Sequence, residues 1–147
     1  MLDVRDIMTS EVFTLAESDT LKTARSMMSL ARVRHIPIVS KKLNFIGLLT
    51  HRDILGASIS QFAGIDSKTQ DEIDAGIPIS EIMRTDVKTV SPNVSVREAA
   101  EILLNHKYGC LPVVEGKILV GIVTEADFLK LTIKLMQALD LVSGDEF

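Results

Sequence analysis

The sequence has few of the residues that mark several large protein classes. It holds one cysteine, no tryptophan and four prolines, and aromatic residues make up 4% of its 147 residues. A single cysteine, Cys110, excludes an internal disulfide and a zinc site built from several cysteines. No apolar run approaches the roughly 18–20 residues of a membrane-spanning helix. Residues 1–6 lack the apolar core of a secretory signal, so we expect a cytoplasmic protein without a membrane span.

Basic residues are also fewer than acidic residues. The chain has 16 Lys and Arg against 20 Asp and Glu, which gives a net charge of -4. Binding to nucleic acid without sequence preference needs a basic face that neutralises phosphates, so we expect no nucleic-acid partner. Apolar residues make up 46% and charged residues 24%, which is typical of a globular chain able to bury a core.

The second half of the sequence repeats the first half. The offset is 75 residues up to the middle of each copy and 74 after a one-residue deletion. The matched segments are Ile36–Val39 with Leu111–Val114, Gly47–Thr50 with Gly121–Thr124, and Asp53 with Asp127. So many matches in the same order indicate a duplicated unit, which decides the architecture.

Each copy predicts the element order β-α-β-β-α. A short β-branched strand comes first, at residues 12–15 and 87–90, and an amphipathic helix follows it. In the second copy Ser95 and Glu98 form a capping box at the start of this helix. The remaining predicted elements are the strands after Pro37 and Pro112, the strands 45–49 and 119–123, and helices that begin near Thr50 and Thr124. We place the first motif at residues 1–65, a linker at 66–78 and the second motif at 79–147.

Two segments lie outside this pattern. The stretch Gly56–Ile77 reads as the end of a helix, a loop and one more helical turn. The tail 128–141 carries Leu129, Ile133 and Met136 at helical spacing and is apolar on more than one face. Such a face predicts burial against another copy of the repeat or another chain.

The repeated pattern resembles the CBS domain. The residues that carry the resemblance are Asp6–Thr9, Val12–Leu15, Arg34–Val39 and Gly47–Asp53 in the first copy, and Glu81–Arg84, Tyr108–Val114 and Gly121–Asp127 in the second. The resemblance implies an α/β fold of two tandem β-α-β-β-α motifs packed sheet to sheet with pseudo-two-fold symmetry. It also implies a homodimer that binds AMP, ADP, ATP or S-adenosyl methionine between the motifs and regulates a protein partner.

The Thr-x-x-Asp pairs, Thr50 with Asp53 and Thr124 with Asp127, have two interpretations. Each pair follows an apolar strand and opens a helix, so Thr caps the helix and Asp favours its first turn. The resemblance adds a second role, in which Asp accepts hydrogen bonds from both ribose hydroxyls. The two roles are compatible, because a capped helix start holds the carboxylate still.

The resemblance assigns two ligand pockets, each drawn from both copies. Backbone groups just before Pro37 and Pro112 would face adenine, and Val12 and Val87 would touch its ring; without the resemblance these are strand-entry and core positions. The first pocket comprises Thr50, Asp53, Arg84, Val87, Thr89, Tyr108, Gly109, Leu111, Pro112, Arg34 and His35. The second comprises Thr124, Asp127, Thr9, Val12, Thr14, Val33, Arg34, Ile36 and Pro37.

The two pockets differ in positive charge. The first copy carries Arg34, His35, His51 and Arg52, and the matching positions of the second copy are Gly109, Cys110, Glu125 and Ala126. Arginine matches phosphate oxygens well, so we hypothesise that the Asp53 pocket prefers a phosphorylated ligand. The alternative is that these charges are solvated surface groups.

The sequence offers no catalytic centre. The three histidines lack metal-site spacing, there is no phosphate-binding loop motif, and no nucleophile has a base beside it. We therefore predict a non-catalytic sensor with no metal and no cofactor other than its regulatory ligand. The competing hypotheses are an interaction or dimerisation scaffold without a physiological ligand and, as a third reading, an undetected nucleotide hydrolase.

Overall fold

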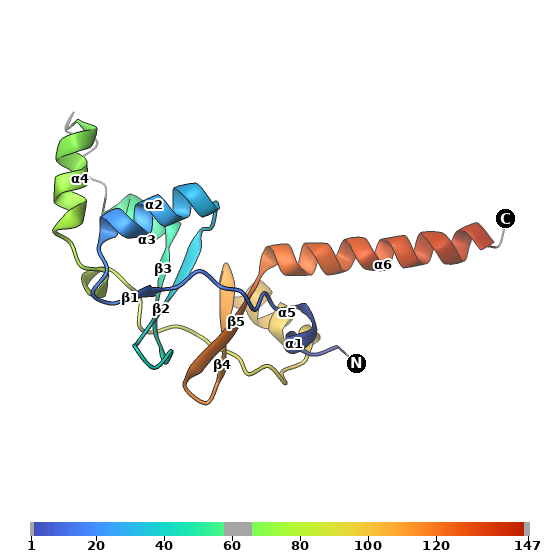
Figure 1. The fold of residues 1–147 in the computed structure, drawn as a ribbon. Coiled ribbons are helices and arrows are strands. Elements are labelled where there is room, and N and C mark those ends of the chain that lie inside the picture. The colour runs from blue at the N-terminus through green and yellow to red at the C-terminus, as the bar shows by residue number, and fades with distance from the viewer. Residues whose placement is uncertain (1, 58–65, 146–147) are drawn as a thin grey trace. The chain divides into compact units, whose positions relative to one another are not determined.

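A computed structural model describes residues 2–57 and 66–145 of the chain. The chain divides into two compact units, which are described separately (Figure 1). Unit 1 comprises residues 1–11, 88–115 and 120–147, and unit 2 comprises residues 12–87 and 116–119. Both units combine helices with a small sheet, which confirms the predicted α/β class.

Unit 2 is built on a three-stranded sheet. Strand β2 (His35–Val39) lies in the middle, parallel to β1 (Leu15–Ala16) and antiparallel to β3 (Phe45–Thr50). The helical elements are α2 (Leu21–Ala31), α3 (His51–Gly56), α4 (Ser67–Ala75) and the 3₁₀ turn η2 (Ile79–Glu81). Apolar side chains of these elements form one core: Leu15, Leu21, Ala24, Met28, Ile36, Ile38, Leu49, Ile54 and Ile79.

Unit 1 has a two-stranded sheet, in which β4 (Cys110–Glu115) neighbours β5 (Ile118–Thr124). Its helices are α1 (Val4–Ile7), α5 (Val96–His106) and α6 (Glu125–Asp145). Helix α5 begins at the predicted cap, where the N–H of Glu98 donates to Ser95 Oγ at 3.1 Å. The core consists of Val4, Val90, Ala99, Leu103, Leu111, Val113 and Val123.

The first strand of each copy is shorter than predicted. The segment 12–15 yields only Leu15–Ala16, and the segment 87–90 yields a single parallel bridge between Val90 and Val113. In the second copy the N–H and the carbonyl of Val90 are both paired, but Pro92 follows and has no N–H to continue a ladder. The strand therefore ends after one residue.

The leading segments of the two copies, residues 4–9 and 79–84, are exchanged between the units: each packs in the unit that holds the sheet of the other copy. Val4 of the first copy is buried in the core of unit 1, and its repeat equivalent Ile79 is buried in the core of unit 2. Backbone hydrogen bonds fix both segments: Thr9 pairs with Ile122 and Arg84 pairs with Leu48, at 2.8–2.9 Å. Each unit therefore contains residues from both copies, and the motif boundaries remain a prediction about the sequence repeat.

Two equivalent glycines allow the leading segments to approach the strands. A Cβ on Gly47 would lie 2.7 Å from Met83 Sδ and 3.1 Å from the carbonyl oxygen of Arg84. A Cβ on Gly121 would lie 2.7 Å from Met8 Sδ and 2.9 Å from the carbonyl oxygen of Thr9. Only glycine leaves room for this contact without displacing backbone.

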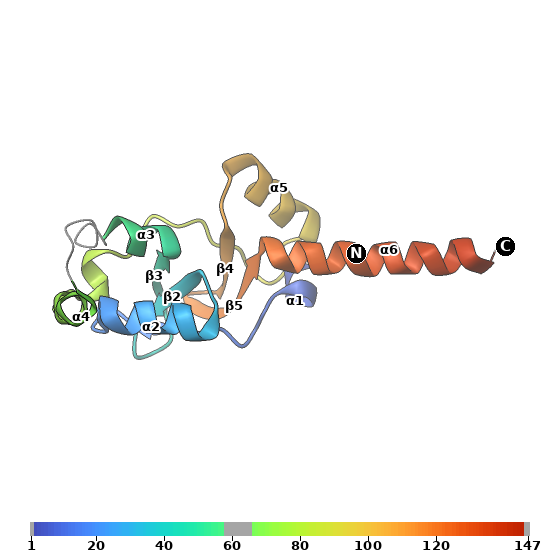
Figure 2. The ribbon, with the colours of Figure 1, turned by 90° about the horizontal axis from the view of Figure 1, so that it is seen from above.

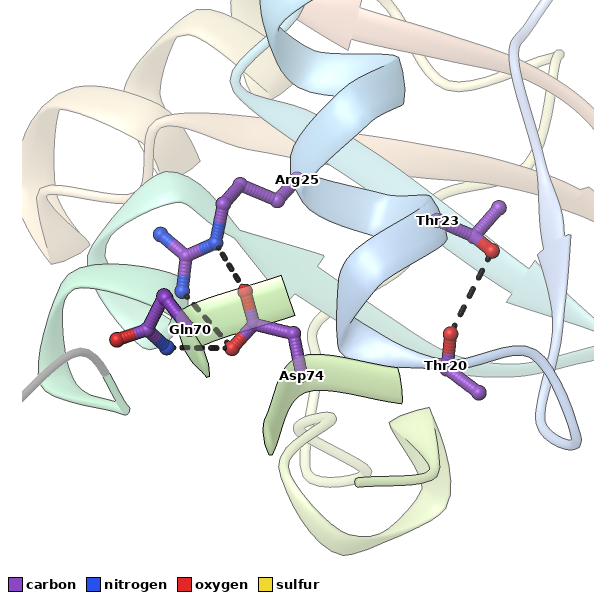
Figure 3. A network of polar contacts seen from close by, with 5 residues as sticks. All are labelled: Thr20, Thr23, Arg25, Gln70 and Asp74. Atoms are coloured by element: carbon purple, nitrogen blue, oxygen red, sulfur yellow. Dashed lines mark hydrogen bonds and ion pairs between the residues drawn. The ribbon is translucent and has the colours of Figure 1, made fainter. Parts of the chain in front are cut away.

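Helix α4 lies in the predicted linker and is a nine-residue helix rather than one extra turn. Asp66 caps it by accepting from the N–H of Thr69 at 2.8 Å, and this bond lowers the pKa of the Asp66 carboxyl. The helix is tied to α2, because Asp74 is fully buried and accepts from Arg25 Nε and Gln70 Nε2, both at 2.7 Å (Figure 3). Within the stretch Gly56–Ile77, residues 58–65 lie outside the described residues.

Helix α6 extends well past α1 and α5 within unit 1 (Figures 1 and 2). Most of its large apolar side chains are more than half exposed: Leu129, Ile133, Leu135, Met136, Leu139, Leu141 and Val142. Within this chain, the apolar side chains of the tail are therefore exposed rather than buried against the repeat. Over residues 2–57 and 66–145, none of the helices has the length and hydropathy required to traverse a bilayer.

We expect Gly47→Ala to lower the free energy of unfolding by about 1–3 kcal/mol, because the new methyl group overpacks the Met83 contact. Gly56→Ala is the matched control, because a Cβ there meets nothing within 4 Å and alanine favours a helix by up to about 1 kcal/mol. Urea unfolding of both variants measures the difference. Equal stability of the two variants would contradict the role given to Gly47.

Candidate functional site

The first candidate site surrounds the carboxylate of Asp53 at the start of α3. Strand β3 ends at Thr50, whose extended backbone and side chain cap the helix: the N–H of Asp53 donates to Thr50 Oγ1 at 3.3 Å. In return, Asp53 Oδ2 accepts from the Thr50 N–H and from the Thr50 hydroxyl, both at 2.8 Å. This reciprocal capping box fixes the carboxylate at the end of the strand.

Arg84 occupies the other oxygen of the same carboxylate. Its Nε donates to Asp53 Oδ1 at 2.9 Å, and the Asp53 side chain is 11% exposed while that of Arg84 is 60% exposed. Residues 53 and 84 are distant in sequence and belong to different copies. They meet because the exchanged segment brings Arg84 against β3 through its backbone pairing with Leu48.

Unit 1 holds an equivalent arrangement around Asp127. Its Oδ2 accepts from the Thr124 N–H at 2.9 Å and from the Thr124 hydroxyl at 3.4 Å. Its Oδ1 accepts from the Thr9 hydroxyl at 3.2 Å. Thr9 is the repeat equivalent of Arg84, so the two sites share one geometry and differ in the charge of the group at Oδ1.

The cations predicted beside Asp53 do belong to the end of the sheet that carries it. His35 pairs with Thr50 in the β2–β3 register, and the N–H of His51 donates to the carbonyl of Arg34 at 2.9 Å. Arg52 is exposed on the first turn of α3. The equivalent positions of unit 1 carry no cation, so the difference in charge between the sites extends beyond Arg84.

The remaining predicted residues divide between the units. Unit 2 contains Val12, Thr14, Val33, Ile36, Pro37 and Val87; unit 1 contains Thr89, Tyr108, Gly109, Leu111 and Pro112. Ile36, Pro37, Leu111 and Pro112 are buried within this chain. The joining of residues from both units into one pocket stays a prediction.

One ring contact was not predicted from the sequence. His106 and Tyr108 stack with ring centroids 5.4 Å apart, because Lys107 between them adopts the left-handed conformation that ends α5, with φ at 56°. A lysine gives no sign of this conformation, which glycine usually supplies. Tyr108 lies two residues before β4 begins.

Cys110 does not provide a nucleophile. It is buried, and burial raises the pKa of its thiol to about 12. A thiol with that pKa stays protonated near neutral pH. Within residues 2–57 and 66–145, no group of three His, Cys, Asp or Glu side chains is placed to hold a metal ion.

Comparison with known proteins matches this architecture. The sequence profile described as "CBS domain" covers residues 4–60 and 79–134. The chain belongs to the CBS-domain family. It carries two tandem CBS repeats, which confirms the resemblance inferred from the motifs.

Three relatives of this CBS-domain chain are similar to it along most of their length. The CBS domain-containing protein YhcV of Bacillus subtilis is 35% identical over 86% of this chain and 83% of its own. The structure of AcuB from Vibrio cholerae superposes with a TM-score of 0.80 at 34% identity, over 95% of this chain and 96% of that one. CBSX2 of Arabidopsis thaliana, solved in complex with AMP, shares the fold with a TM-score of 0.78 at 22% identity, over 92% and 99%.

Proposed function

We propose that this CBS-domain pair is a non-catalytic regulatory module that binds an adenosine-containing ligand through the carboxylates of Asp53 and Asp127. The observation that carries the proposal is the duplicated capping geometry. In each unit a buried or nearly buried carboxylate is fixed by its own Thr and faces a residue of the exchanged segment. A ribose diol presents two donors to such a carboxylate.

The relatives support this ligand class. CBSX2, which has the same fold, is solved with AMP, and AMP, ADP, ATP and S-adenosyl methionine all contain the ribose that the carboxylates would recognise. Binding would favour one arrangement of the two units, and a protein partner would detect that arrangement. The shared pocket, the regulated partner and the cytoplasmic location belong to this proposal.

The test is isothermal titration of the wild type and of the double variant Asp53→Asn, Asp127→Asn with AMP. Asparagine keeps an oxygen that can accept from the Thr N–H, so the helix caps survive, but it loses the charge that strengthens bonds from ribose. We expect AMP affinity to fall by about tenfold or more. Asp71→Asn, an exposed position on α4, is the control. Unchanged AMP affinity in the double variant would refute the proposal.

A second candidate function is dimerisation through α6, favoured by the exposed apolar face of that helix. Leu135, Leu139 and Val142 follow coiled-coil spacing, and the 21-residue helix is about 31 Å long. Both lysines of the helix, Lys130 and Lys134, lie in its first half together with Glu125 and Asp127, and Asp140 lies in its second half. Antiparallel pairing with a second copy would bury the apolar face and place Asp140 opposite the half that carries both lysines.

Light scattering tests this pairing. We expect the wild type at about 50 µM to have twice the chain mass of 16.1 kDa, and Leu135→Glu, Leu139→Glu to return it to one chain, because charges are costly to bury. Leu104→Glu, at an exposed position on α5, is the control and should leave the dimer intact. A monomeric wild type, or a dimer that survives the double variant, would exclude α6 pairing.

A further inference from the structure

We propose that Arg84 makes the Asp53 site selective for phosphorylated adenosine ligands, because its guanidinium competes with the ribose for the same carboxylate. The inference rests on the proposed function and adds the ligand class of one site. It assigns Arg84 two partners in turn, the carboxylate when the site is empty and a phosphate when it is filled.

The competition follows from the number of acceptor positions. An ionised carboxylate offers about four lone-pair positions. Asp53 already uses three of them, two for Thr50 and one for Arg84. The Thr50 bonds belong to the helix cap, so a ribose that donates two hydroxyl protons must displace Arg84.

The structure lets Arg84 move without unfolding anything. Its backbone is fixed, because its N–H and carbonyl both pair with Leu48 at 2.8 Å. Its side chain is 60% exposed, so the guanidinium can leave the carboxylate and remain solvated. Displacement therefore costs one charge-assisted hydrogen bond and leaves the strand pairing intact.

That cost depends on the ligand. Adenosine is neutral, so its hydroxyls replace the ion pair at Asp53 and leave the guanidinium without an anionic partner. AMP supplies a phosphate, whose oxygens match the guanidinium fork. The Arg34 and Arg52 charges on the same unit add to the attraction for phosphate.

The Asp127 site provides an internal comparison. Thr9 stands in the place of Arg84, and its hydroxyl is a neutral donor at 3.2 Å that can rotate away. The same displacement there breaks a weaker bond and frees no cation. We therefore expect the Asp127 site to bind adenosine and AMP with more similar affinities than the Asp53 site does.

The experiment removes the carboxylate of one site and, at the other site, replaces the residue that donates to Oδ1 of the remaining Asp. In an Asp127→Asn background, where only the Asp53 site keeps its carboxylate, titrations with adenosine and AMP are compared for Arg84 and for Arg84→Thr. We expect Arg84→Thr to raise adenosine affinity and to reduce the AMP-to-adenosine affinity ratio by about tenfold. In the mirror background, Asp53→Asn, Thr9→Arg should increase that ratio. Arg97→Thr, an exposed arginine on α5, controls for net charge.

The outcomes separate the two proposals. If the Asp127→Asn protein binds neither adenosine nor AMP, the ribose-binding function of the Asp53 carboxylate fails and this inference fails with it. If it binds both ligands but Arg84→Thr leaves their ratio unchanged, or changes it no more than Arg97→Thr does, the selectivity of Arg84 is refuted and the ribose proposal stands.

Discussion

The structure depends on a carboxylate that closes the turn between a strand and a helix. Asp53 and Asp127 each accept the backbone N–H of the Thr three residues before them, at 2.8 and 2.9 Å. The bond satisfies a donor at the strand end that neither element pairs. One consequence is a rigid start for α3 and α6. The other is a carboxylate held in one orientation, which a ligand can use without paying to order it.

The exchanged leading segments give these carboxylates their third partner. Backbone pairing of Thr9 with Ile122 and of Arg84 with Leu48 depends on the small volume of Gly121 and Gly47. Both units thus hold a carboxylate in the same capping geometry, and the two sites differ in charge at Arg84 and at the basic positions of the first copy. A duplication can in this way keep one local scaffold while the charges around its carboxylate diverge.

The sequence alone predicts the duplication, because the two halves can be matched position by position. It also predicts the α/β class and the Thr–Asp caps, because these depend on residues close together in the chain. The ion pair of Arg84 with Asp53 could not be derived from the residues around either position. It depends on the leading segment 79–84 packing against a strand of the other copy. The length of α4 was also underestimated, since one helical turn was predicted and the helix has nine residues. Its polar sequence lacks an apolar stripe. The helix contacts α2 through the buried Asp74, which accepts from Arg25. The α6 pattern correctly predicted an apolar helix. Its side chains are exposed within this chain, so burial against another chain stays a prediction.

Comparing AMP with 2′-deoxy-AMP tests the recognition of the ribose by the wild-type chain most directly. The two ligands differ only in one hydroxyl, so contacts with the base and the phosphate contribute equally to both affinities. The capped carboxylates predict that loss of this donor weakens binding by about tenfold, because a bond to a charged acceptor is lost. Equal affinities in isothermal titration would contradict the account, since the carboxylates would then not hold the diol.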